Sequence, residues 1–149
     1  MDALAVRRLM RSPVVTVPPR ATLPQLKQLM REHGIRRLPV VEADRLLGIV
    51  TLGDVRNAFP SDATTLSIYE LSYLLDKVTA GDIMRTELVT IDADASVVEA
   101  ARAMLEHKVS GLPVVERDRL VGIITESDIF RAIVAGALAP AGAPASAAG

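Results

Sequence analysis

The sequence repeats itself once, and this repeat restricts the possible folds more than any other feature. Residues 38–54 (LPVVEADRLLGIVTLGD) align without a gap with residues 112–128 (LPVVERDRLVGIITESD), and 12 of the 17 positions are identical. At the same offset of 74, the repeat extends over about residues 6–59 and about residues 80–133. This period is longer than the roughly 20–50 residues of solenoid repeats, so it predicts two similar units rather than an array.

The first half of each copy predicts a strand followed by a helix. In the first copy, residues 2–10 indicate a short lead-in helix, and the β-branched stretch at residues 14–17 predicts a short strand. Thr22 with Gln25 three residues later has the pattern of a helix capping box, and Gly34 marks the end of that helix. The equivalent helix of the second copy is expected to begin with Ser96 and Glu99 and to bury Val97, Ala101 and Met104.

The second half of each copy predicts a β-hairpin followed by a helix. Residues 38–42 and 46–51 are short apolar runs on either side of a tight turn around Ala43-Asp44, which is typical of an antiparallel hairpin. A Thr-x-x-Asp sequence comes next, and it predicts the start of a helix. Each copy is therefore expected to fold as β-α-β-β-α, and the fold class is α/β in its α+β form.

The repeat divides the chain into four segments. Residues 1–60 form the first unit with its lead-in helix, and residues 80–136 form the second unit. Residues 61–79 connect them through a helix of about ten residues, which is expected to cross from one unit to the other and to pack between units or subunits. The apolar residues at helical spacing in this connector are Leu66, Tyr69, Tyr73 and Leu74. Residues 137–149 carry no charge and are rich in Ala, Pro and Gly, which predicts a disordered tail.

The composition argues against several classes of protein. The chain has no cysteine, which excludes disulfides, thiolate metal sites and a cysteine nucleophile. It shows no secretory signal and no apolar run near the roughly 20 residues of a membrane span, so a soluble cytoplasmic protein is expected. Aromatic residues make up 3% and the net charge is −1, so a nucleic-acid partner is not expected. Residues 1–59 carry a charge of +5 and residues 60–149 a charge of −6; the basic part either holds an anion or complements the acidic part.

Taken together, these motifs resemble a tandem pair of cystathionine-β-synthase (CBS) domains, the Bateman module. The resemblance rests on a hydrophobic-Pro-Val-Val strand, a Gly-Ile-hydrophobic-Thr strand and the x-x-Asp that follows, each present twice and in order. It covers about residues 6–133. The connector sequence SIYELSYLLDKV, followed by GDIM, is similar to stand-alone bacterial CBS proteins of the acetoin-utilisation type.

The resemblance implies both an architecture and a function. In the family, two CBS units pack sheet to sheet about a pseudo-twofold axis, and adenine nucleotides or S-adenosylmethionine bind in clefts between them. The implied role of this chain is regulatory: it binds AMP, ADP, ATP or S-adenosylmethionine as a ligand, requires no cofactor, and signals to an effector protein. A homodimer is expected from the family and from the apolar connector helix.

The two Thr-x-x-Asp motifs, Thr51 with Asp54 and Thr125 with Asp128, allow a structural and a functional interpretation. Thr at the N-cap and Asp three residues later satisfy free backbone amides at a helix start, which is a role in folding alone. A carboxylate at the mouth of a cleft can also accept hydrogen bonds from the two ribose hydroxyls of a nucleoside. The resemblance implies the ribose role for both carboxylates, and one residue can serve both roles.

Arg36 and Arg37 directly precede the first hairpin strand, where they are either solvated surface charges or phosphate ligands. The resemblance implies phosphate contact, for which the planar guanidinium is well suited. The second copy has Ser110 and Gly111 at the equivalent positions. We therefore expect two unequal sites, either one competent site alone or one strong and one weak.

The remaining candidate residues also come from the resemblance, which implies that the start of each unit meets the adenine edge and that apolar residues pack on the ring. The residues at these positions are Thr16, Val17, Thr90 and Ile91, with Ile35 and Val109 as the apolar wall. His33 and His107 match in the repeat, but a histidine that closes a helix suits the helix dipole, and no second ligand lies at metal spacing. No phosphate loop, nucleophile motif or paired catalytic carboxylate is present, so neither a metal site nor an enzyme is expected.

The main alternative is a ligand-independent interaction or dimerisation module. In that case the repeated motifs would serve only as helix caps and core residues. An enzyme is the weakest alternative, and DNA binding would have to use the basic first part of the chain. The response of thermal stability to adenosine compounds distinguishes the ligand-binding module from the interaction module.

Overall fold

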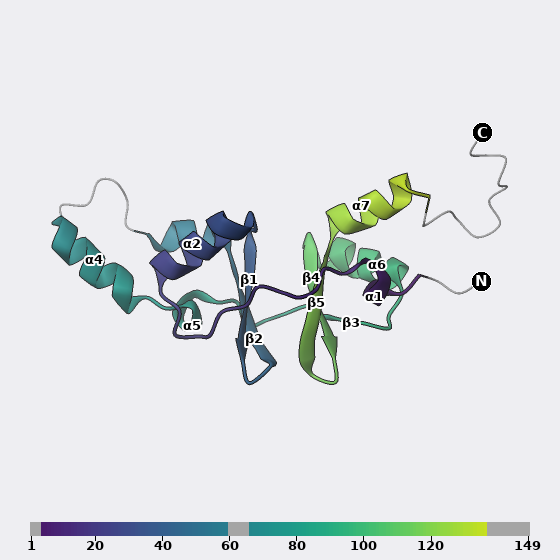
Figure 1. Cartoon of the computed structure of the whole chain (residues 1–149), viewed down its shortest axis with the longest axis horizontal. Coiled ribbons are helices and arrows are strands. Elements are labelled where there is room, and N and C mark those ends of the chain that lie inside the picture. The colour runs from purple at the N-terminus through teal and green to yellow at the C-terminus, as the bar shows by residue number, and fades with distance from the viewer. Residues whose placement is uncertain (1–3, 60–65, 137–149) are drawn as a thin grey trace. The chain divides into compact units, whose positions relative to one another are not determined.

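The computed structural model describes residues 4–59 and 66–136, which form two compact units of mixed α+β structure (Figure 1). The first-repeat unit contains residues 15–59 and 66–88. The second-repeat unit combines residues 4–14 with residues 89–136. In each unit, helices pack on a β-hairpin, which confirms the predicted fold class.

The helices and strands of the two units follow the repeat closely. The first-repeat unit contains α2 (Leu23–His33), β1 (Arg37–Glu42), β2 (Arg45–Thr51), α3 (Leu52–Ala58), α4 (Ile68–Lys77) and α5 (Ala80–Ile83). The second-repeat unit contains α1 (Val6–Leu9), β3 (Ile91–Asp92), α6 (Val97–His107), β4 (Gly111–Glu116), β5 (Arg119–Thr125) and α7 (Glu126–Val134). Helix α4 comes from the connector, which has no match in the repeat.

The hairpin turns confirm the prediction made from the repeat. Ala43 and Asp44 join β1 to β2 with φ angles of 52° and 66°, and Arg117 and Asp118 join β4 to β5 with 53° and 66°. Two consecutive residues with positive φ are typical of a type I′ turn, whose twist matches that of antiparallel strands. Both hairpins also shift register by one residue at the same place, between the two valines of the Pro-Val-Val sequence.

The long helix of each repeat begins and ends as its sequence predicts. Helix α2 has the capping box formed by Thr22 and Gln25, and it ends at Gly34 in the left-handed conformation (φ 60°). Helix α6 begins at Ser96, whose hydroxyl accepts a hydrogen bond from the Glu99 amide at 3.0 Å. At the position equivalent to Gly34, the second repeat has Lys108, which is also left-handed (φ 55°). A side chain there is strained, since the left-handed region costs a non-glycine residue roughly 1–2 kcal/mol.

Replacing Lys108 by glycine is therefore expected to stabilise the protein by about 0.5–1 kcal/mol, because glycine adopts the left-handed region at no steric cost. Urea unfolding monitored by circular dichroism measures the change. Gly34→Ala is the reciprocal control and is expected to destabilise by about 1 kcal/mol. A loss of stability in Lys108→Gly would show that the lysine side chain makes a contribution that outweighs the backbone strain.

The short helix that precedes each repeat in the sequence packs in the core of the other repeat: α1 with the second repeat and α5 with the first. Val6 of α1 is fully buried in the core of the second-repeat unit, where its amide donates to the Ala95 carbonyl at 2.8 Å. The equivalent residue Ala80 of α5 is fully buried in the core of the first-repeat unit, where its amide donates to the Ala21 carbonyl at 2.7 Å. The compact units are thus discontinuous in the sequence, whereas the segments suggested by the repeat alone, 1–60 and 80–136, are contiguous.

The strand predicted at residues 14–17 is wrong, since only Val17 pairs there, through a single parallel bridge to Val40. The equivalent residue of the second repeat, Ile91, begins the two-residue strand β3. The difference has a simple cause: Pro18 and Pro19 follow Val17 and have no amide hydrogen to donate to a neighbouring strand. The second repeat has Asp92 and Ala93 at these positions, and the Ala93 amide donates to the Val115 carbonyl at 3.0 Å.

Two smaller expectations also need correction, and two others lie outside the described residues. Helix α6 buries Ala100 completely, whereas Ala101, which was expected to be buried, is half-buried. The lead-in helix α1 spans Val6–Leu9, so it is shorter than the predicted range of residues 2–10. Residues 1–3 and the predicted disordered tail at 137–149 are not among the described residues.

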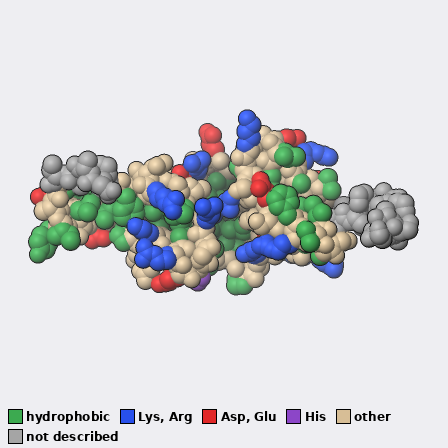
Figure 2. Space-filling view, turned by 90° about the horizontal axis from the view of Figure 1, so that it is seen from above, with side chains coloured by type: hydrophobic (Ala, Val, Ile, Leu, Met, Phe, Trp, Pro, Cys, Tyr) green, Lys and Arg blue, Asp and Glu red, His purple; other side chains and the backbone are tan. Residues whose placement is uncertain are grey.

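Helix α4 has the predicted length of ten residues but leaves much of its apolar surface exposed. It belongs to the first-repeat unit, where it lies against α2. Its most exposed large apolar side chains are Tyr69 (85% exposed), Ile68 (73%) and Tyr73 (63%). Figure 2 shows hydrophobic side chains, coloured green, over α4. None of the helices in the described part of the chain combines the length and apolar character that a membrane span needs.

Candidate functional site

The candidate site of the first repeat lies at the start of α3. The Thr51 hydroxyl accepts a hydrogen bond from the Asp54 amide at 3.1 Å, and Asp54 Oδ2 accepts one from the Thr51 amide at 3.0 Å. This reciprocal pair is the capping box predicted from the Thr-x-x-Asp motif. It holds the Asp54 carboxylate in a partly buried position, with 14% of its side chain exposed.

Arg85, which follows α5, pairs with Asp54. Arg85 Nη2 and Nε donate to Asp54 Oδ1 at 3.0 and 3.2 Å, so the guanidinium binds the carboxylate through two nitrogens. The backbone of Arg85 is fixed by two hydrogen bonds with Ile49, at 3.0 and 2.9 Å. This segment crosses directly over Gly48, where an added Cβ would lie 2.8 Å from the Arg85 carbonyl oxygen. The glycine therefore permits the close approach that brings Arg85 to Asp54.

The second repeat has the same arrangement. Asp128 Oδ2 accepts hydrogen bonds from the Thr125 amide at 2.9 Å and from the Thr125 hydroxyl at 3.0 Å. Arg11, the residue equivalent to Arg85, donates from Nε to Asp128 Oδ1 at 3.1 Å. The Arg11 backbone pairs with Ile123 next to Gly122. Met10-Arg11 and Met84-Arg85 match at the offset of the repeat, but this match alone does not show that the arginines contact the motif carboxylates.

The pKa of Asp54 reflects two opposing effects. Burial alone raises the pKa of this carboxyl, but hydrogen bonds from Arg85 and from Thr51 favour the charged form and hold the pKa below its ordinary value. In turn, Asp54 raises the pKa of the Arg85 guanidinium. A depressed carboxyl pKa stabilises the folded state above the unfolded pKa of about 3.9, and the contribution is lost as the pH falls through the folded value.

We therefore expect the Asp54 carboxyl to titrate below about pH 3.9 in the intact protein and at a higher pH in Arg85→Ala, because the variant loses the guanidinium donor. Carboxyl chemical shifts from NMR, recorded between about pH 2 and pH 6, measure both midpoints. Arg45→Ala removes an exposed arginine elsewhere in the same unit and should leave the midpoint unchanged. Identical Asp54 midpoints in the intact protein and Arg85→Ala would contradict the assignment of the pair.

A small cleft next to this cap contains three of the predicted site residues. The cleft has a volume of about 210 Å³ and is lined by Arg36, Arg37, Thr51, Leu52, Gly53 and Arg56. A backbone hydrogen bond from the Leu52 amide to the Arg36 carbonyl, at 2.8 Å, ties the start of α3 to the residue before β1. Arg56 was not predicted; it lies one turn beyond Leu52 on α3, a spacing that places side chains on the same side of a helix. Three arginine residues thus line one small cleft.

Thr16 and Val17, predicted to meet the adenine edge, line a different groove of about 590 Å³ beside α2. Val17 is only 3% exposed, because it belongs to the core. Ile35, predicted as an apolar wall, is half-buried and packs against the same core. The structure therefore brings together Arg36, Arg37 and Thr51 but does not place Thr16 and Val17 in that cleft.

The second-repeat residues occupy matching backbone positions without the arginines. Gly111 is the first residue of β4, and the Ser110 carbonyl accepts a hydrogen bond from the Glu126 amide at 3.0 Å. Val109 packs against the core, Ile91 begins β3, and Thr90 is exposed. The two repeats thus share the cap and its arginine partner but differ in the residues that precede the hairpin.

The matched histidines end their helices, as the sequence predicted. His33 is the last residue of α2 and His107 the last of α6, and both are exposed. Within residues 4–59 and 66–136, no group of three or more His, Cys, Asp or Glu side chains is arranged to hold a metal ion.

Comparison with known sequences identifies the family. The sequence profile described as the CBS domain matches residues 6–61 and again residues 80–135. The chain belongs to the CBS-domain family. Hypoxic response protein 1 of Mycobacterium tuberculosis is 38% identical over 128 residues, which cover 84% of this chain and 82% of that protein. The resemblance inferred from the repeated motifs is thereby confirmed.

Solved structures of CBS proteins share the fold over most of the chain. A putative acetoin utilization protein (AcuB) from Vibrio cholerae superposes with a TM-score of 0.76 at 31% identity, covering 91% of this chain and 94% of that one. The CBS domain pair of protein MJ0100, in complex with 5′-methylthioadenosine and S-adenosyl-L-methionine, gives 0.74 at 26% identity, with coverages of 91% and 99%. CBSX2 in complex with AMP gives 0.72 at 27% identity, with coverages of 90% and 98%. Adenosine-containing ligands are thus found in structural neighbours of this CBS pair.

Proposed function

We propose that this CBS pair is a regulatory module that binds an adenosine-containing ligand, which is AMP, ADP, ATP or S-adenosylmethionine, and signals its occupancy to a partner. The main support is the cleft of the first repeat, where Arg36, Arg37 and Arg56 lie around Thr51 at the start of α3. Asp54 of the same capping box is the proposed ribose acceptor. The location of the bound ligand between the repeats, which the family resemblance implies, stays a prediction.

In the proposed mechanism the ligand competes with Arg85 for Asp54. The vicinal ribose hydroxyls donate to the Asp54 carboxylate, which accepts a hydrogen bond from Arg85 Nη2 at 3.0 Å in the structure described above. Arg85 then loses part of its pairing with Asp54, and the segment that carries it is displaced or re-paired. Ligand binding can shift the conformation only by its difference in affinity for the two states, and the Arg85–Asp54 pair is one such difference.

The two repeats are proposed to bind with unequal affinity. The second repeat has the same cap, with Asp128 and Arg11, but it has Ser110 and Gly111 in place of the arginine pair. A phosphate group would there lose two guanidinium donors, and hydrogen bonds to charged groups are worth about 1.5–3 kcal/mol each. The first repeat is therefore the strong site, and Thr16, Val17, Thr90, Ile91, Ile35 and Val109 stay candidate adenine contacts.

A thermal-shift panel of AMP, ADP, ATP, NAD and S-adenosylmethionine tests the proposal. A ligand present at 100 times its dissociation constant is expected to add about 2.7 kcal/mol of stability, because it binds only the folded state. Adenosine and inorganic phosphate, tested separately, show how much of the response comes from each part of the ligand. The absence of a response to every adenosine compound would reject the proposal and favour a ligand-independent interaction module.

The alternative interaction module is supported by the exposed apolar surface of the chain, and a homodimer is compatible with both functions. Exposed large apolar side chains occur on α4 and also on α7, where Phe130 is 59% exposed and Val134 87% exposed. Such surfaces are typical of contacts with other proteins. We therefore propose a homodimer and an effector protein as partners, in the cytoplasm, with a regulatory rather than catalytic role. Turnover of any compound in the panel would contradict the regulatory role.

A further inference from the structure

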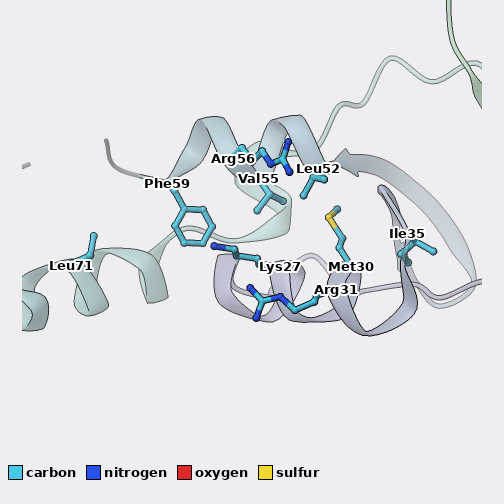
Figure 3. Close-up of a pocket in the computed structure, with 9 residues that line it drawn as sticks. All are labelled: Lys27, Met30, Arg31, Ile35, Leu52, Val55, Arg56, Phe59 and Leu71. Atoms are coloured by element: carbon cyan, nitrogen blue, oxygen red, sulfur yellow. The ribbon is translucent and has the colours of Figure 1, made fainter. Parts of the chain in front are cut away.

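A second, larger groove in the first-repeat unit lies beside the small cleft of the proposed nucleotide site. It has a volume of about 630 Å³ and runs between α2, α3 and α4 (Figure 3). Its floor is apolar: Met30 from α2 and Val55 from α3 point toward each other, and Phe59 lies at the end of the groove nearest Leu71 of α4. This volume is within the range of about 300–1,000 Å³ that is typical of small-molecule sites.

Three cationic side chains border this apolar floor. Lys27 and Arg31 are one turn apart on α2, and Arg56 reaches the groove from α3. Lys27 Nζ lies 4.9 Å from the centre of the Phe59 ring, which is a cation–π contact. Within the described part of the chain, no carboxylate lies within 4.0 Å of any of the three cations. Cations grouped without a counter-charge favour the binding of an anion.

The internal repeat shows that the fold does not require these cations. At the equivalent positions of the second repeat, Lys27 is replaced by Ala101, Arg31 by Leu105 and Arg56 by Phe130. The apolar floor, in contrast, is kept in both repeats: Met30 corresponds to Met104, Val55 to Ile129 and Ile35 to Val109. The floor residues therefore serve the core, whereas the three cations are a feature of the first repeat alone.

We propose that this groove is a second ligand site, specific for a single-chain amphiphile with an anionic head group. The carboxylate or phosphate of the amphiphile pairs with Lys27 and Arg31, and its apolar chain lies along the partly exposed side chains of Leu52, Phe59 and Leu71 above the buried floor. Leu52 and Arg56 also line the small cleft of the proposed nucleotide site, so the two sites adjoin. Lys27 and Arg31 line only the larger groove, so variants at these two positions test this site separately from the proposed function.

Calorimetric titration with decanoate and decyl phosphate, both below their micellar concentrations, tests this site. We expect one molecule to bind per chain, and we expect hexanoate to bind at least about tenfold more weakly, since each buried methylene contributes up to about fourfold in affinity. Decanol, which lacks the charge, and inorganic phosphate, which lacks the chain, should both bind at least about tenfold more weakly than decyl phosphate.

The double variant Lys27→Ala/Arg31→Leu installs the residues of the second repeat, so it should fold normally while losing about tenfold or more in affinity for decanoate. Arg45→Ala/Arg119→Ala is the matched control: it removes the same charge from exposed, repeat-equivalent positions at the hairpin starts and should bind decanoate as the intact protein does. The response to adenosine compounds should be the same in all three proteins, which separates this site from the proposed function.

Three results would each overturn the proposal. The first is the absence of binding of both decanoate and decyl phosphate to the intact chain. The second is unchanged affinity in Lys27→Ala/Arg31→Leu, or an equal loss in Arg45→Ala/Arg119→Ala, which would indicate a non-specific charge effect. The third is binding of decanol as tight as that of decanoate, which would mean that the groove does not select for an anion.

Discussion

Gly48→Ala is expected to lower the free energy of unfolding by about 1–3 kcal/mol, the usual cost of an overpacked core position. The new Cβ would lie 2.7 Å from Met84 Sδ and 2.8 Å from the Arg85 carbonyl oxygen. A methionine side chain can move, but the carbonyl is held by its hydrogen bond to the Ile49 amide at 3.0 Å. The added methyl group must therefore displace the backbone segment that brings Arg85 to Asp54. Urea unfolding measures the loss of stability.

Gly53→Ala provides a control of opposite sign in the same unit. A Cβ at Gly53 would meet only Thr51 Oγ1, at an ordinary contact distance of 3.7 Å, and the residue lies in α3. Alanine in a helix is favoured over glycine by roughly 0.5–1 kcal/mol, so this variant should be neutral or more stable than the intact protein. If Gly48→Ala proved as stable as Gly53→Ala, the close packing of the Arg85 segment on β2 would be wrong.

Asp54→Ala is expected to weaken adenine-nucleotide binding by about 100-fold. It removes the proposed ribose acceptor, and a charge-assisted hydrogen bond of 1.5–3 kcal/mol corresponds to roughly 10- to 150-fold in affinity. Asp128→Ala is the matched control, because Asp54 and Asp128 close equivalent capping boxes and both variants should lose about 1 kcal/mol of stability. Since the second repeat lacks the arginine pair, Asp128→Ala should change the tighter binding constant by less than about threefold.

Isothermal titration of both variants, at a temperature where both are folded, measures these affinities. Equal losses in Asp54→Ala and Asp128→Ala would contradict the unequal sites that the arginine pair implies. Full retention of affinity in Asp54→Ala would remove the ribose role and leave Asp54 as a helix cap alone.

Most local structure could be predicted from the sequence because it depends on residues close together in the chain. The hairpin turn at Ala43-Asp44 lies between two apolar runs, and the start of α3 follows from Thr51 and Asp54. The strand predicted at residues 14–17 did not form, although its β-branched residues favour a strand. The prolines at 18 and 19 have no amide hydrogen, so they cannot continue the hydrogen bonds of a β-sheet.

The candidate site could be predicted only in part because its arginines come from distant segments. Arg85 lies 31 residues from its partner Asp54, and Arg11 lies 117 residues from Asp128. Their positions depend on the exchange of lead-in segments between the repeats, which no local pattern encodes. Two features of the sequence nevertheless point to this arrangement. The Met-Arg pair recurs at the offset of the repeat, and so does the glycine on which each pair packs, as Gly48 and Gly122.

The most direct test of the proposed function is a crystal structure of the chain with the adenosine compound that gives the largest thermal shift. We expect both ribose hydroxyls to donate to Asp54 and the phosphate, or the equivalent polar group, to contact Arg36 or Arg37. We also expect that Arg85 no longer binds the carboxylate through two nitrogens. A ligand bound away from Asp54, with the Arg85 pair intact, would contradict it.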